Sequence, residues 1–160
     1  MKTISFNPDN IGGVALIFAI PVSAFIRVKK DYVSGLSYVS VSSKDDIIQI
    51  PVINDSSFSF IESQSLESGG DMYAVKISGV IPRIDISDDI RRELERGEWM
   101  VMHADANGSF RISGSEDVPL IFSSSRSTGG SPSSLNGNSF SFSGNEPDPS
   151  EEVQSVIIIE

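Results

Sequence analysis

The stretch from His103 to Ser115, H-A-D-A-N-G-S-F-R-I-S-G-S, holds the residues of this chain whose types suit chemistry most directly. It contains the only histidine of the sequence, with Asp105 two residues later and the pair Asn107-Gly108 after that. Such a histidine and aspartate could bind a metal ion or exchange a proton, and D-A-N-G resembles the start of a calcium-binding loop. The same residues could instead form a hairpin, because Asn-Gly is the pair that a type I′ turn prefers.

The sequence around His103 favours the hairpin over a metal site. Zinc needs several nitrogen, oxygen or sulfur ligands, and the chain has no second histidine and no cysteine. An EF-hand loop needs further ligands and a helix on either side, whereas strand-like patterns flank Asp105. We therefore predict no metal and no cofactor, a turn over residues 105–108, and a return strand, F-R-I-S, that pairs with W-M-V-M. His103 is expected to be a packed or half-exposed strand residue whose replacement by alanine changes little.

No other group of residues predicts catalysis. Only His103 could act as the base of a Ser/His/Asp triad, and no serine stands out as its nucleophile. The stretch S-T-G-G-S-P (127–132) lacks the Gly-Lys-[Ser/Thr] ending of a phosphate loop and a helix after it. The paired carboxylates are interpreted as solvated runs or helix caps: Asp45-Asp46, Asp88-Asp89, Glu116-Asp117 and Glu151-Glu152. We expect no catalytic residue and predict that the protein is not an enzyme.

The elements that position this stretch are predicted to be strands. Apolar residues recur mainly at every second position, which is typical of strands with one buried face. Residues that favour tight turns separate the runs. The predicted strands cover residues 37–42, 46–53, 57–62, 72–81, 98–103, 109–113, 118–122, 138–143 and 153–159. Short strands at this spacing predict an all-β fold, an antiparallel β-sandwich or barrel.

One segment, S-D-D-I-R-R-E-L-E-R-G (87–97), is predicted to be a short α-helix. Ser87 can cap its first turn, Ile90 and Leu94 share one face, and Gly97 suits a left-handed residue after its end. Its basic side chains are expected on a solvated face, with contact to an acidic partner as the alternative: Arg91, Arg92 and Arg96.

The composition divides the chain into three parts. Residues 1–122 are predicted to form the β core domain with its helix. Residues 123–152 are rich in Ser, Gly and Pro, and we interpret them as a loop and an acidic arm with one short strand around Phe140 and Phe142. Residues 153–160 alternate again and predict a terminal strand that docks on this molecule or on a neighbour.

Charge and hydropathy exclude two classes of partner. The 160 residues carry a formal net charge of −10, which repels nucleic acid over most of the surface. The most apolar segment, 12–28, is interrupted by Pro21 and Arg27, so it is too short for a membrane span. It could also be a signal-peptide core that ends at Val22-Ser23-Ala24, but the leader has one lysine offset by an aspartate. We predict buried strands that meet at Pro21, and neither a nucleic-acid nor a membrane partner.

A series of short motifs runs in order through most of the chain. The features are Gly12-Gly13 before an apolar strand, F-I-E (60–62), Gly70 and Tyr73, the helix with Leu94, W-M-V-M before D-A-N-G (105–108), S-G-S (113–115), S-T-G (127–129), L-N-G (135–137) and F-S-F-S-G (140–144). In this order they resemble a family of small structural proteins of phages and prophages of gut Bacteroidetes, placed among virion or tail genes. After the last glycine that family continues with basic and proline residues, whereas this chain has N-E-P-D-P-S-E-E.

The resemblance implies a structural subunit of a virion, in a tail or neck, that acts by self-assembly. Its implied partners are copies of itself, in a ring or tube, and other virion proteins, and its implied location is the cytoplasm during assembly and then the virion. A carbohydrate- or surface-binding module is the alternative, and it would need exposed aromatic residues. Four aromatic residues are the candidates, and core packing is the favoured use of them: Tyr32, Tyr38, Tyr73 and Trp99. A second alternative is an enzyme of unknown type, which would bring His103 near carboxylates of other strands.

Overall fold

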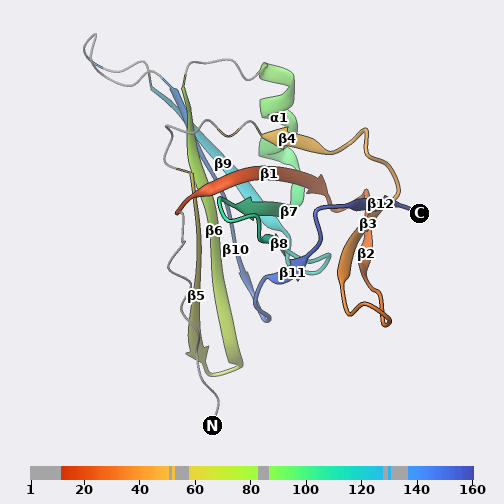
Figure 1. Cartoon of the computed structure of the whole chain (residues 1–160). Coiled ribbons are helices and arrows are strands. Elements are labelled where there is room, and N and C mark those ends of the chain that lie inside the picture. Colours follow the sequence, from red (N-terminus) through yellow and green to blue (C-terminus); the bar gives the residue numbers. More distant parts are fainter. Residues whose placement is uncertain (1–11, 51, 53–57, 83–86, 128–129, 131–136) are drawn as a thin grey trace.

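The computed structural model describes residues 12–50, 52, 58–82, 87–127, 130 and 137–160, and these residues form a β-sandwich with one short helix. Three layers of strands lie side by side (Figure 1). The long-strand sheet contains β5 (Ser59–Glu67), β6 (Gly70–Pro82), β9 (Leu120–Ser127) and β10 (Gly137–Glu146). The central sheet contains β1 (Val14–Pro21), β4 (Ile48–Ile50), β7 (Glu98–Asp105), β8 (Phe110–Ser113) and β11 (Glu151–Val153). The small sheet contains β2 (Phe25–Lys30), β3 (Ser37–Val41) and β12 (Ile157–Ile159).

The first two layers are parts of one sheet, joined where β7 begins. Glu98 and Trp99 pair with Ile121 and Leu120 of β9, whereas the rest of β7 pairs with β8 on that side and with β1 on the other. The long-strand sheet follows the order β9-β10-β6-β5, and every pair in it is antiparallel. The described strands form open layers and not a closed barrel, so the sandwich form of the predicted fold is confirmed.

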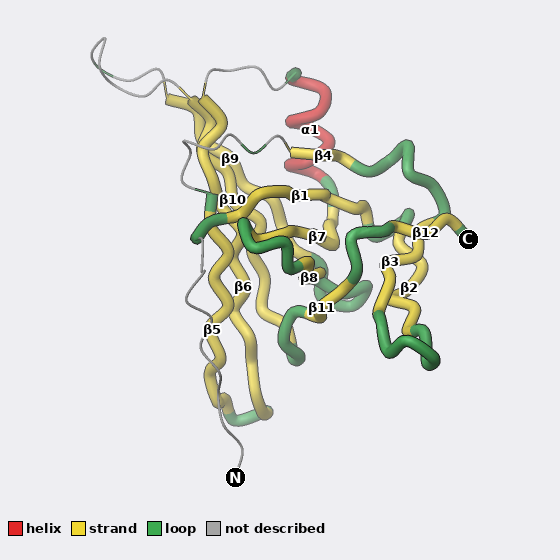
Figure 2. Tube along the Cα trace, viewed as in Figure 1, coloured by secondary structure: helices red, strands yellow, loops and turns green. Residues whose placement is uncertain are grey.

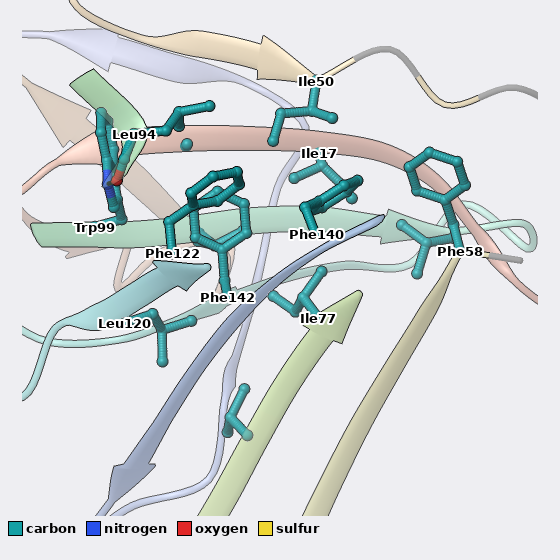
Figure 3. Close-up of a cluster of buried hydrophobic side chains, with 14 of the residues drawn as sticks. Ile17, Ile50, Phe58, Ile77, Leu94, Trp99, Leu120, Phe122, Phe140 and Phe142 are labelled. Carbon is teal, nitrogen blue, oxygen red and sulfur yellow. Dashed lines mark hydrogen bonds between the residues drawn. The ribbon is translucent and has the colours of Figure 1, made fainter. Parts of the chain in front are cut away.

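Two hydrophobic clusters lie on the two faces of the central sheet. The larger one fills the space between the central and long-strand sheets, and Figure 3 shows its aromatic centre of Phe122, Phe140 and Phe142. The smaller one lies between the central and small sheets and contains Met100 and Met102 of β7. All six residues of the run W-M-V-M-H-A in β7 are buried, because alternate side chains of this strand point into different clusters.

The helix α1 (Asp88–Arg96) lies at one end of the sandwich and is the only helix among the described residues (Figure 2). The Ser87 hydroxyl accepts a hydrogen bond from the Ile90 N–H at 3.3 Å, which confirms the predicted N-cap. Leu94 is buried, whereas Ile90 is 43% exposed, so the apolar face is narrower than predicted.

Gly97 does not adopt the predicted left-handed conformation, since its φ of −83° and ψ of 163° are extended. A glycine is needed there for a different reason: a Cβ atom would lie 2.5 Å from the Trp99 ring. That ring packs over the end of the helix, and its Nε1–H donates to the Leu94 carbonyl oxygen at 2.9 Å. Trp99 therefore satisfies one of the carbonyl groups that the last turn of a helix leaves unpaired.

The apolar segment 12–28 forms two strands, as the sequence predicted, and they meet at a turn after Pro21. The Ala24 N–H donates to the Pro21 carbonyl oxygen at 2.9 Å. Of the two strands, β1 is the buried one. β2 packs Phe25 and Val28 against the smaller cluster, and the other face of β2 is exposed. No described helix has the length and hydropathy needed to cross a membrane.

The C-terminal part has more regular structure than predicted. β9 continues to Ser127, and β10 is a ten-residue strand in the long-strand sheet instead of a short strand within a loop. The predicted terminal strand is divided between two sheets: β11 pairs with β8, and β12 pairs in parallel with β3. The chain crosses between these sheets at Gln154, whose N–H donates to the Ser37 carbonyl oxygen at 2.8 Å.

Candidate functional site

The turn between β7 and β8 is a hairpin, as the sequence predicted, but its geometry differs from type I′. The Gly108 N–H donates to the Asp105 carbonyl oxygen, which places Ala106 and Asn107 at the centre of the turn. Gly108 follows in the left-handed conformation, with a φ of +85°. This is the three-residue loop in which a left-handed residue follows a type I turn.

The Asp105 side chain explains this choice of turn. Its Oδ1 atom accepts hydrogen bonds from the Asn107 N–H at 2.9 Å and from the Ser109 N–H at 2.8 Å. The carboxylate therefore stabilises the backbone of the loop instead of serving as a partner for His103. The predicted return strand is confirmed, but its pairing is shifted by two residues: Val101 to Ala104, and not W-M-V-M (99–102), pair with Ser113 to Phe110.

Two glycines that flank β8 allow the cost of a left-handed conformation to be compared with and without crowding. Gly108 and Gly114 are both left-handed, but only Gly114 is crowded: its Cβ would lie 2.9 Å from the Trp99 carbonyl oxygen. We expect Gly108→Ala to lower the free energy of unfolding by about 1 to 2 kcal/mol, the cost of the left-handed conformation. Gly114→Ala should cost at least about 1 kcal/mol more, because the backbone must also shift. Urea denaturation of the two variants measures the difference, and equal losses would contradict the crowding at Gly114.

His103 is buried at 3% exposure, which agrees with the first of the two predicted alternatives, a packed strand residue. Its ring lies against Phe60 of β5, with 4.3 Å between the ring centroids. Its Nδ1 atom is buried and has no hydrogen-bond partner among the described residues. Burial and, to a smaller extent, the Arg111 guanidinium lower the pKa of His103 from 6.5 to about 4, although Asp105 and Glu62 act in the opposite direction. His103 is therefore neutral at neutral pH and too weak a base to serve as an efficient proton acceptor.

A cavity of about 230 Å³ lies beside His103, at the end of the larger hydrophobic cluster. Phe58 and Phe60 line it on one side, and Asp105 and Arg111 line it on the other. The charged groups at its rim are already engaged, since the Arg111 guanidinium donates to the Ser150 carbonyl oxygen at 3.2 Å. Of the carboxylates that the enzyme hypothesis requires, the structure places Asp105 and Glu62 near enough to His103 to raise its pKa against the effect of burial.

A second buried titratable group, Glu146, lies in a groove of about 250 Å³ between the central and small sheets. Its Oε1 atom accepts a hydrogen bond from the Gly114 N–H at 2.8 Å. Burial raises the pKa of Glu146, and the neighbouring Glu62 and Asp148 raise it further. This carboxyl group holds the turn after β8 in place.

The acidic pairs named from the sequence lie on the surface, and Glu116 and Glu151 both line the groove that contains Glu146. Asp45-Asp46 and Glu116-Asp117 are exposed in turns, and Glu151-Glu152 is exposed in β11. Asp88-Asp89 begins the helix, where Arg126 is the main cause that lowers the pKa of Asp88. The described residues contain no group of acidic or histidine side chains that could hold a metal ion. Of the phosphate-loop candidate 127–132, only Ser127 and Gly130 lie within the described residues.

The arginines and aromatic residues of the binding hypotheses have different environments. Arg91 bonds to Asp88 and Glu95 of its own helix, and Arg92 and Arg96 are exposed. Trp99 is buried in the core, whereas Tyr38 and Tyr73 are half-buried. Core packing was predicted for Tyr32, but this residue is 92% exposed in the turn after β2. The four aromatic candidates thus do not form a common exposed platform.

The largest regular surface lies on the long-strand sheet, on the side away from the core. We define the outer face by the residues of β5, β6, β10 and β9 that point to this side: Ser59, Ile61, Ser63, Ser65, Glu67, Met72, Ala74, Lys76, Ser78, Val80, Ser139, Ser141, Ser143, Asn145, Ile121, Ser123, Ser125 and Ser127. Two shallow hollows of about 370 Å³ and 380 Å³ lie along it. The charged members of this described set are Lys76 and Glu67, which have opposite charges.

A row of serines crosses the outer face at right angles to the strands. Ser59, Ser78, Ser141 and Ser123 lie directly opposite one another on four successive strands. The Oγ atoms of Ser59 and Ser78 are 3.2 Å apart, and those of Ser141 and Ser123 are 3.0 Å apart. These side chains satisfy one another within the sheet, so the outer face is smooth and nearly neutral. The sequence showed the alternating serines, but only the strand order reveals that they form one surface.

Comparison of the chain with family models, with curated proteins and with solved structures finds no match.

Proposed function

We propose that the protein is a structural subunit of a phage or prophage virion, in a tail or neck, that acts through self-assembly. The single observation that supports self-assembly best is the outer face. The chain carries a net charge of −10, yet this face spans four strands and its charged residues, Lys76 and Glu67, have opposite charges. Protein interfaces are depleted of charged residues at their centre, and copies that meet through this face avoid the repulsion between their acidic surfaces.

The resemblance in the order of motifs from Gly12 to Gly144 supports the virion part of the proposal. In this proposal the partners are further copies in a ring or tube and other virion proteins, and the chain moves from the cytoplasm into the particle. Detection of the chain by mass spectrometry in purified particles tests this part, and its absence from particles of a producing strain would contradict it.

Self-assembly is tested with the purified chain. Sedimentation velocity and light scattering over a wide concentration range should show a rise in mass, and negative-stain microscopy should show rings or tubes. A particle that remains monomeric at millimolar concentration and at every ionic strength would overturn the proposal.

A pair of charges on the outer face should weaken the assembly. We expect Ser123→Glu with Ser139→Glu to lower the association constant at least tenfold, because like charges brought together at an interface cost several kcal/mol. Both serines are exposed, so circular dichroism and thermal unfolding should stay close to those of the parent chain. Ser155→Glu, an exposed site between β11 and β12, is the matched control and should leave association unchanged. Equal association of all three proteins would show that the outer face is not the interface.

A further inference from the structure

We infer that the edge of β5 opposite β6, which has no described strand beside it, pairs antiparallel with β5 of a second copy, so that two long-strand sheets become one continuous sheet of twice the width. This inference rests on the proposed self-assembly and adds a second contact, at the edge of the sheet, to the contact through the outer face. In the described part of the chain β5 pairs only with β6, and its other edge has no strand beside it. At about 3.4 Å per residue, the nine residues of β5 present about 30 Å of unpaired backbone.

Apart from Glu62 and Glu67, the edge of β5 lacks the features that protect edge strands from pairing. Its sequence, S-F-I-E-S-Q-S-L-E, contains no proline and no lysine. Its register with β6 is continuous from Ser59 to Glu67, without a bulge. Natural edge strands are commonly short, bulged, or interrupted by lysine or proline, and β5 is none of these.

The sequence of β5 is complementary to itself in one antiparallel register. With the two-fold axis at Ser63, Glu62 faces Gln64 of the second copy, and Ser59 faces Glu67. No carboxylate faces another carboxylate directly, and an amide lies opposite each Glu62. In an antiparallel pair, directly opposite residues point to the same side of the sheet.

The same register explains two exposed apolar side chains. Leu66 is 84% exposed, and it lies opposite Phe60 of the second copy, on the core side of the sheet. Ile61, at 54% exposure, lies opposite Ser65 on the outer face. Pairing therefore covers Leu66 with an aromatic ring and continues the nearly neutral outer face across both copies.

Because the natural chain has no cysteine, single cysteine substitutions can test this register without background. In the Ser63→Cys variant the two introduced thiols face each other across the axis, at a Cα–Cα distance of about 4.5 to 5.5 Å, within the range of a disulfide. We expect mild oxidation at associating concentrations to link most of the chains into dimers. Ser65→Cys is the matched control: its two thiols would lie four residues apart along the strand, at about 14 Å, and should link at least tenfold less.

Sedimentation of the same samples separates the two proposals. Association together with far more disulfide-linked dimer in Ser63→Cys than in Ser65→Cys supports the inference. Association with equal linkage in the two variants overturns the β5 register and leaves self-assembly standing. The absence of association overturns both proposals.

Discussion

Between pH 6.5 and pH 4, the His103→Phe variant is expected to lose about 3 kcal/mol less unfolding free energy than the parent chain loses. The pKa of His103 falls from 6.5 to about 4 in the folded chain, chiefly because the ring is buried, so the unfolded chain binds the proton more tightly. The stability that depends on neutral His103 is fully present above pH 6.5 and is lost as the pH falls towards 4. At about 1.4 kcal/mol per pKa unit, this interval gives the stated magnitude.

The measurement is the free energy of unfolding by urea at several pH values between 7 and 4. Phenylalanine keeps a ring against Phe60 and removes the unpaired Nδ1 atom, so the variant should fold and should lose less stability with acid. Glu146→Gln is the informative comparison, because burial raises the pKa of Glu146 and its protonation favours the folded chain as the pH falls. This variant should therefore lose more stability with acid than the parent does. Parallel curves for the parent and His103→Phe would refute the assignment of the buried neutral imidazole.

The Phe142→Ala variant is expected to lose about 3 to 5 kcal/mol of unfolding free energy, as buried phenylalanines do when truncated. Phe142 is fully buried in β10, and its ring lies 5.0 Å from that of Phe122 and 6.1 Å from that of Phe140. Truncation opens a cavity at the centre of the larger cluster, between two sheets that cannot close over it without moving their strands. Such a loss is a large part of the stability of a typical domain.

The neighbouring residue provides the control for this prediction. Ser141 lies on the outer face of the same strand, so Ser141→Ala should change the free energy of unfolding by less than about 1 kcal/mol. The loss of unfolding free energy for Phe142→Leu should lie between those of Phe142→Ala and Ser141→Ala, because leucine keeps part of the apolar volume. A Phe142→Ala variant as stable as Ser141→Ala would contradict the placement of β10 against the core.

Local patterns predicted the elements well where the hydrophobic period was clear. The alternation in β6 and β10 and the capped helix at Ser87 come from interactions within a few residues, and the structure contains them. The length of β10 was underestimated because Ser and Gly have low strand propensity, and its pairing with β6 and β9 overrides that propensity. The division of the terminal segment at Gln154 depends on where β3 lies, which no local pattern encodes.

The candidate sites, too, were predictable only where their interactions are local in the sequence. The hairpin at Asp105 was predictable, because its carboxylate and Gly108 act on adjacent backbone groups. The residue that packs on the buried His103 ring was not predictable, because Phe60 comes from a strand distant in the sequence. The outer face was missed for a related reason: its serines come from four strands, and only their order in the sheet brings them together.

The position of β7 between two hydrophobic clusters has a consequence for how order is lost. Trp99 and Val101 belong to the larger cluster, whereas Met100 and Met102, on the same strand, belong to the smaller one. If β7 separates from one cluster, its residues in the other cluster also become exposed. The layers therefore cannot unfold one after the other. The sandwich should behave as a single cooperative unit, in which a disturbance at one sheet is felt thermodynamically at the other.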